Sequence, residues 1–222
     1  MASVLVIAAH PDDEVLGCGG TIARHSAAGD EVHVVILAQG LMARPQAKAE
    51  DLEALRRAAR EAGDTLGVAD LTLHDYPDNR LDTIPRLDVT RFIESHIERV
   101  LPEIVYTHHR GDVNIDHVRA NECTLAACRQ IPGQSLRRLL FFEVPSSSEW
   151  GPGAEPFIPN WFVDISRTLD RKAAALRAYA SEMRPSPHPR SEEAVTHLAR
   201  WRGATAGVPA AEAFVLARNV ER

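Results

Sequence analysis

The chain alternates short apolar runs with amphipathic stretches, and this alternation limits its possible folds more than any other feature. The strand candidates are short, apolar and rich in β-branched residues, at 3–9, 31–37, 71–73, 104–107 and 139–142. The helical patterns lie between and after them, at 20–28, 47–66, 87–100, 117–128, 167–180 and 191–202. Strands separated by helices predict an α/β fold, with a Rossmann-like, mainly parallel sheet and helices on both faces.

The length and composition are those of an ordinary globular chain. A chain of 222 residues is long enough for one domain with a substantial core, so we expect a single domain over 1–222. The net charge of −6 and the lack of a basic block argue against a nucleic-acid partner. No apolar run approaches the roughly 20 residues that span a bilayer, and the N-terminus shows no signal-peptide pattern. Three cysteines without a C-x-x-C pair favour a reducing compartment, so a cytoplasmic location is expected.

A dense cluster of polar groups follows the first predicted strand, where residues 9–14 read Ala-His-Pro-Asp-Asp-Glu. Open α/β sheets bind ligands beyond the carboxyl ends of their strands. His10 and Asp13 suit a zinc-like divalent ion, which takes imidazole and carboxylate ligands. Asp12, between them, is then free to act as a general base toward water. The alternative is an Asp-rich turn that caps a helix beside a surface histidine.

A second polar cluster, residues 108–117, follows the strand candidate at 104–107. Catalytic zinc sites usually have three protein ligands, and His117 is the natural third. His108 and His109 are alternatives that lie closer to the strand end. Asp116 could orient a ligand histidine or cap a helix.

These motifs resemble the PIG-L/LmbE-like family of zinc-dependent N-deacetylases. The resemblance lies in AHPDDE after the first strand, GGT shortly after it, and the later Asp-His pair at 116–117, and it extends over most of the chain. It implies His10, Asp13 and His117 as metal ligands and Asp12 as the base. The segments 187–191 and 211–214 are similar to the branch that acts on N-acyl amino sugars, which implies that residues 143–222 form the substrate side of one deacetylase-like domain.

The chain departs from the family at residue 114, where many members have a histidine that helps to stabilise the oxyanion. Asn114 can donate a neutral hydrogen bond but cannot supply a proton. The general acid is then Asp12, returning its proton, or another histidine. We consider His188, in the proline-braced loop 184–190, as the cationic donor. The alternative for this loop is a rigid connector with solvated side chains.

Three further residues are candidates for substrate binding. In the family an Arg and an Asp bind sugar hydroxyls from places that Arg56 and Asp78 occupy here, with Arg57 and Arg60 as neighbouring alternatives to Arg56. Arg190 shares the proline-braced loop with His188 and suits a polar substrate. Each arginine could equally belong to a solvated surface.

The sequence thus favours a hydrolase that removes an N-acyl group, expected to be acetyl, from an amino sugar or a sugar-containing metabolite. Zn²⁺ is the expected cofactor, and Fe²⁺, Mn²⁺ or Co²⁺ could fill the same ligand set. The expected partner is a small molecule, and a homo-oligomer is possible. The alternative is a non-catalytic protein that binds a small molecule or nucleotide sugar on the same scaffold. Residues 17–20 match neither a phosphate-binding P-loop nor a dinucleotide fingerprint.

Overall fold

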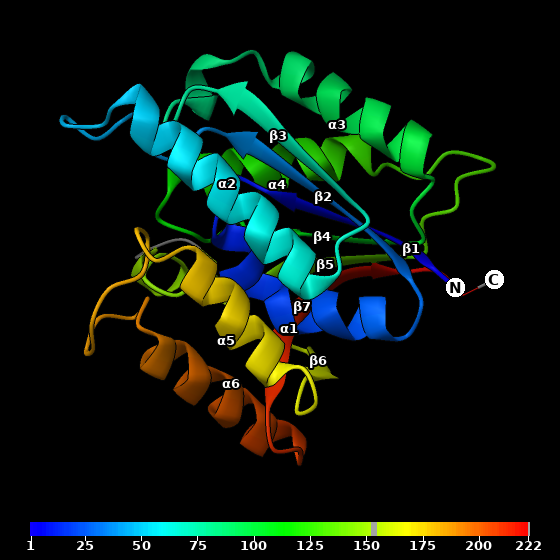
Figure 1. The fold of residues 1–222 in the computed structure, drawn as a ribbon. Helices are drawn as coiled ribbons and strands as arrows, with labels where there is room; N and C mark the ends of the chain where they lie inside the picture. Colours follow the sequence, from blue (N-terminus) through cyan, green and yellow to red (C-terminus); the bar gives the residue numbers. More distant parts are fainter. Residues whose placement is uncertain (152–154, 222) are drawn as a thin grey trace.

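The computed structural model describes residues 1–151 and 155–221, and seven strands of this part form one sheet (Figure 1). Their order across the sheet is β3-β2-β1-β4-β5-β7-β6. The strands are β1 (Ser3–Ala8), β2 (Glu31–Ala38), β3 (Asp70–Tyr76), β4 (Ile104–His108), β5 (Arg138–Phe142), β6 (Trp161–Asp164) and β7 (Ala211–Asn219).

Five neighbouring strands pair in parallel, as the alternation of strands and helices predicts: β3, β2, β1, β4 and β5. The chain runs outward from β1 through β2 to β3, and then returns to place β4 on the other side of β1. The order of the strands therefore reverses between β1 and β4. In open α/β sheets a crevice for ligands lies at such a switch point, beyond the carboxyl ends of the strands.

Helices cover both faces of the sheet (Figure 1). One face packs against α1 (Asp13–Ala27), α2 (Ala49–Leu66), α5 (Leu169–Ala178) and α6 (Glu192–Ala206), in a cluster that includes Leu55 and Leu176. The other face packs against α3 (Arg86–Val100) and α4 (Ile115–Ala127), around Ile93 and Cys123. Two short 3₁₀ turns, Leu81–Thr83 and Ser148–Trp150, complete the elements of residues 1–151 and 155–221. The expected α/β fold, with a mainly parallel sheet and helices on both faces, is confirmed.

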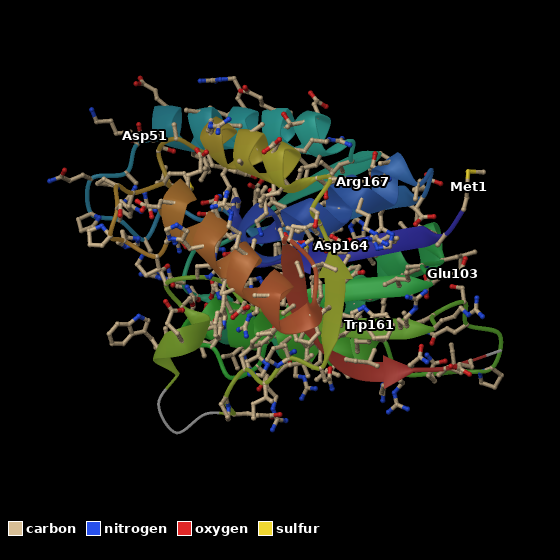
Figure 2. The ribbon with its side chains drawn as sticks, turned by 90° about the horizontal axis from the view of Figure 1, so that it is seen from below. Met1, Asp51, Glu103, Trp161, Asp164 and Arg167 are labelled. Carbon is tan, nitrogen blue, oxygen red and sulfur yellow. The ribbon has the colours of Figure 1, made fainter. Side chains whose placement is uncertain are left out.

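The sequence did not predict β6 and β7, which extend the sheet with antiparallel pairing. β7 pairs antiparallel with both β5 and β6. Figure 2 labels Trp161 and Asp164 at the two ends of β6, at the margin of the sheet. Only alternate residues of β6 are partly buried, and β7 is buried only in its first four residues and becomes exposed toward its end. Neither strand therefore has the continuous apolar character that marks the central strands.

The first helix begins at Asp13, seven residues before the predicted start at Gly20. Four residues of low helix propensity, 17–20, obscure the pattern. Their small size has a packing reason. A Cβ on Gly17 would lie 2.3 Å from a ring carbon of Phe142, and one on Gly20 would lie 2.7 Å from Ile165. Close packing against other elements therefore requires glycine at these helix positions, although glycine has a low helix propensity.

The other predicted elements lie close to their observed bounds. The long helix ends as expected at Gly67, which adopts the left-handed conformation (φ 75°) that favours glycine. All three cysteines are buried and free. Among residues 1–151 and 155–221, no helix has the length and apolar character that a bilayer crossing requires.

Candidate metal centre and active site

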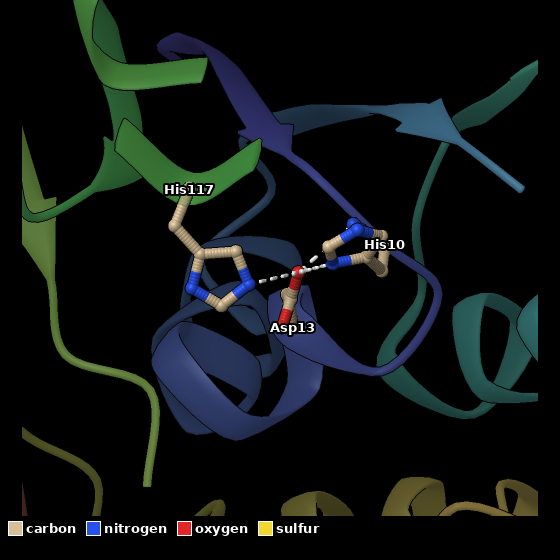
Figure 3. Close-up of side chains that lie close together, drawn as sticks. All are labelled: His10, Asp13 and His117. Carbon is tan, nitrogen blue, oxygen red and sulfur yellow. Dashed lines mark hydrogen bonds and ion pairs between the residues drawn. The ribbon is translucent and has the colours of Figure 1, made fainter. Parts of the chain in front are cut away.

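The proposed ligands come from the carboxyl ends of the two strands that flank the switch point. His10 and Asp13 follow β1, and His117 lies in the first turn of α4, after β4. Figure 3 shows the Asp13 carboxylate between the two imidazoles. Parallel pairing of β1 with β4 brings these residues together although more than a hundred positions separate them in the sequence.

His10, Asp13 and His117 each offer one ligand atom, and these atoms all lie within 4.8 Å of one another. Oδ2 of Asp13 is 3.3 Å from Nδ1 of His10 and 3.2 Å from Nε2 of His117. Within the described part of the chain, Oδ1 of Asp13 and Nε2 of His117 are buried without a hydrogen-bond partner. Buried polar atoms normally have a partner, so unpartnered ligand atoms within this group fit a site for a divalent cation.

A second carboxylate lies behind each imidazole. Nε2 of His10 donates to Oδ2 of Asp116 over 2.9 Å, and Nδ1 of His117 lies 3.1 Å from Oδ2 of Asp112. Asp116 also accepts the backbone N–H groups of Asn79 and Leu81. These contacts leave Nδ1 of His10 and Nε2 of His117 on the side of Asp13, the arrangement that carboxylates behind metal-bound histidines commonly produce. The hydrogen bond to His10 fits the orienting role expected for Asp116, and the N-cap position of α4 is occupied by Asn114.

The carboxylates give the site a strongly negative potential. Burial alone would lower the pKa of His10, but hydrogen bonds to Asp116 and Asp13 raise it to about 10. Burial likewise opposes the charged form of His117, yet the charge of Asp13 and the hydrogen bond to Asp112 raise its pKa to about 9. Although burial opposes ionisation of Asp112, the hydrogen bond from His117 lowers its pKa to about 2. A site that favours protonated imidazoles so strongly is one that attracts a cation.

Asp12 stands apart from the three ligand candidates. Its backbone is left-handed (φ 107°, ψ −28°), which costs on the order of 1–3 kcal/mol for a residue other than glycine. The N–H of Asp12 donates to Oε2 of Glu14, whose Oε1 accepts the hydroxyl of Tyr179. Oδ2 of Asp12 accepts Nη1 of Arg190 over 3.0 Å. Burial raises the pKa of Asp12 well above its usual value, and the charge of Arg190 opposes that rise.

A cavity of about 320 Å³ opens beside these groups. Eight of its twelve described wall residues are polar or charged. Five of the residues named from the sequence line it: His10, Asp12, Asp78, Asn114 and Arg190. The strand ends and the C-terminal loop therefore meet at one cavity.

Asp78 and Asn114, two further wall residues, are also hydrogen-bonded within the protein. Oδ2 of Asp78 accepts the N–H of Ala43, and its Oδ1 accepts the side-chain amide of Asn79. Asn114 is the N-cap of α4, because its Oδ1 accepts the N–H of Asp116 over 2.8 Å. The Asn114 side chain thus fixes the first turn of the helix that carries His117.

Two predicted residues lie elsewhere. Arg56 forms ion pairs with Glu53 and Asp75 on the surface of α2. His188 is exposed, and its Nδ1 accepts the backbone N–H of Arg190. Neither is among the described residues that line the cavity.

The alternative histidines are committed to other partners. Nε2 of His108 accepts the N–H of Ala9 over 2.8 Å, and Nε2 of His109 donates to the carbonyl of Glu155. Their Nδ1 atoms are buried without a hydrogen-bond partner, as Nε2 of His117 is, but of the three histidines only His117 has a ring nitrogen grouped with His10 and Asp13.

The sequence did not assign several residues that support this site. Asp112 belongs to the second polar cluster, and its spacing five positions before His117 gave no indication of contact. Glu182 is buried, bonds Arg44 through both its oxygens, and lies 3.9 Å from Arg190. Arg44 and Glu182 line the cavity. No local pattern marks these two residues, because their partners are distant in the sequence.

The sequence from residue 5 to residue 128 matches the PIG-L family, described as GlcNAc-PI de-N-acetylase. This match spans more than half of the chain. The protein belongs to the PIG-L family.

Individual relatives agree with this assignment. A Bacillus anthracis protein named as a probable N-acetyl-alpha-D-glucosaminyl L-malate deacetylase 2 is 30% identical over 190 residues, covering 81% of this chain and 80% of that protein. The 4-oxalmesaconate hydratase of Pseudomonas putida is 33% identical over 204 residues, covering 81% and 74%. The crystal structure of a conserved Thermus thermophilus protein superposes with a TM-score of 0.79 at 30% identity, covering 100% and 97%. The fold is thus shared by proteins with more than one activity.

Proposed function

We propose that this PIG-L family member is a metal-dependent hydrolase that removes an N-acetyl group from an amino sugar or a sugar-containing metabolite. The observation that carries the proposal is the placement of Asp12. Its carboxylate lies in the wall of the cavity beside His10, outside the group of three ligand candidates, and is held by Arg190. A binding protein has no need of a buried carboxylate next to a metal centre, so the non-catalytic alternative is less well supported.

His10, Asp13 and His117 would hold the divalent ion, and we propose Zn²⁺ because two imidazoles and one carboxylate suit it. Bound there, such an ion polarises a carbonyl group and acidifies water. Fe²⁺, Mn²⁺ or Co²⁺ would accept the same ligands.

Asp12 would act as the proton carrier. Its carboxylate takes a proton from the attacking water while the new C–O bond forms at the acyl carbon. The same group then gives that proton to the amine nitrogen as the C–N bond breaks, which yields acetate and a free amine. Arg190 holds Oδ2 of Asp12 in a fixed direction throughout. The side-chain amide of Asn114, at the cavity wall, could donate a neutral hydrogen bond to the developing oxyanion.

The cavity suits a hydroxyl-rich ligand of sugar size. Its volume is near the lower end of the range for small-molecule sites. We propose that Asp78 and Arg190 contact the substrate, and Arg44 takes the place that the sequence suggested for Arg56. Residues 143–222, which supply Arg190 and Glu182, form the substrate side in this proposal. A cytoplasmic location and a homo-oligomeric state remain predictions.

The test is to supply purified protein, loaded with Zn²⁺, with a panel of N-acetylated amino sugars and to quantify free amine and acetate. Equal amounts of both products are expected, and chelation of the metal should abolish them. The Asp12→Asn variant should retain the metal and lose turnover, and Asp82→Asn, at an exposed aspartate, serves as the matched control.

Other outcomes separate the alternatives. Saturable binding without turnover of any substrate would favour a binding protein. Hydration of an unsaturated acid without amine release would favour an activity like that of the Pseudomonas putida relative.

A further inference from the structure

Helix α1, which begins with the proposed ligand Asp13, is broken at Cys18. The backbone there has φ −146° and ψ 23°, outside the helical region. The first half of the helix carries Asp13, and the second half runs on to Ala27. Such a break leaves backbone groups on both sides that need other partners.

Glu212, in β7, bonds the second half of the helix. Its Oε1 accepts the N–H of Gly20 over 2.9 Å, and its Oε2 accepts the N–H of Thr21 over 2.6 Å. A carboxylate on the first free N–H groups of a helix segment is favourable because the helix dipole is positive there.

Lys172, in α5, bonds the first half. Its Nζ donates to the carbonyl of Leu16 over 2.8 Å and to Oε1 of Glu212 over 2.6 Å. In a regular α-helix the N–H of Gly20 would bond the carbonyl of Leu16. Here the two charged side chains link these two atoms, and their charges match the dipoles of the two half-helices.

The pair is deeply buried, with 4% of each side chain exposed. Burial of two charges is expensive, and apolar residues of similar size are often as stable or more so. Net stability alone is therefore a poor reason for this pair. α1 packs between α5 and β7 (Figure 1), so the pair also ties the two C-terminal elements to the helix of the metal centre.

We propose that Lys172 and Glu212 are positioning residues for the metal centre: they set the angle between the halves of α1 and so place Asp13 against His10 and His117. Asp13 lies one helical turn before Leu16, whose carbonyl Lys172 holds. A change in the angle at Cys18 would move the carboxylate relative to the two imidazoles. This inference rests on the metal centre proposed above.

The experiment titrates the metal-free full-length protein with Co²⁺ and follows both affinity and the visible spectrum of the bound ion. The test variant is the double substitution Lys172→Met with Glu212→Gln, which removes both charges and leaves neither unpaired. The matched control is Arg202→Met with Glu143→Gln. These two residues form a neighbouring, partly buried pair with two hydrogen bonds of 2.8 Å, from Arg202 in α6 to Glu143 just after β5.

The test variant should bind Co²⁺ about tenfold more weakly, at the lower end of what loss of a supporting contact costs. Its spectrum should change, and excess metal should restore turnover. The control should keep the parent affinity and spectrum, even if its melting temperature falls equally.

Equal affinity in the test variant and the parent would overturn the proposal, and so would equal weakening in the control. If the double variant does not fold, the single variant Lys172→Arg is tested instead, with Arg202→Lys as its control. The proposal then requires that Lys172→Arg weaken Co²⁺ binding more than Arg202→Lys does. A parent protein that binds no Co²⁺ would refute the metal centre itself, and the positioning role with it.

Discussion

The two walls of the active-site cavity differ in how firmly they are held. On the side of the parallel strands, His10 lines the cavity, and Asp13 and His117 lie next to His10. Their side chains are 10%, 1% and 1% exposed, and each imidazole has a carboxylate behind it. The wall from the C-terminal half carries Arg190, whose side chain is 23% exposed, and its loop also carries the exposed His188. The residues that would hold the ion are thus buried and fixed by hydrogen bonds. The residues that would contact the substrate are more exposed to solvent.

This difference follows from the elements that build each wall. The first wall stands at the ends of central strands, packed on both faces, where side chains have few alternative positions. The second is a connection between two helices at the surface, and such loops adapt more easily to ligands. If the contrast is functional, substitutions in the first wall should abolish chemistry, and those in the second should tune it.

The largest effect is expected from removal of a ligand. Asp13→Ala or His117→Ala should lose the metal and reduce turnover to background, because two remaining ligands hold a divalent ion poorly. Metal content by mass spectrometry and product formation are the measurements. His109→Ala is the control, since that imidazole bonds the carbonyl of Glu155, and metal loss in this variant would mean that the ligand set is wrong.

The second-largest effect is expected from Asp12→Asn. This variant should reduce turnover by about 10²–10⁴-fold, the usual contribution of a general acid–base. The metal should stay, because Asp12 lies outside the ligand group. Turnover is measured at matched metal content. Loss of the ion together with activity would instead exchange the roles of Asp12 and Asp13.

Removal of the carboxylate that bonds a proposed ligand histidine should reduce activity less than removal of the ligand itself. Asp112→Asn should weaken metal binding by about 10–100-fold, because His117 would lose the partner that orients it. Competition with a chelator measures this change. An affinity equal to that of the parent would show that packing alone orients the imidazole.

Asn114→Ala should lower stability by about 1 kcal/mol, because the side chain caps the N-terminus of α4, and should also lower turnover through loss of the proposed hydrogen bond to the oxyanion. Denaturant unfolding measures the loss. A far larger fall in turnover than in stability would support an additional role in oxyanion stabilisation.

The smallest effect is expected at His188. Its substitution by alanine should change stability by less than about 0.5 kcal/mol, as is usual for exposed positions, and should affect turnover less than Arg190→Ala does. Disappearance of the alkaline limb of the kcat profile in His188→Ala would contradict this, and would make His188 the protonated group of the mechanism.

The sequence by itself determined the parallel core and the position of the site. Alternating strands and helices allow few topologies, and the carboxyl ends of the strands then become the only edge where two His- and Asp-rich clusters can meet. Four of the polar groups, His10 to Glu14, are local in the sequence, so their grouping required no knowledge of the fold. The extended form of β6 and β7 could not be predicted in this way, since each has only part of its length buried.

Only the tertiary structure decided which groups contact the two imidazoles and Asp12, the proposed base. Asp116 meets His10 across 106 positions, and Arg190 meets Asp12 across 178. Glycine is likewise required at positions 17 and 20 because Phe142 and Ile165 pack against them. The backbone groups left free by the break in α1 bond Lys172 and Glu212. Sequence patterns report burial and local backbone preference. Ion pairs between distant segments depend on how those segments pack, and their spacing along the chain carries no such signal.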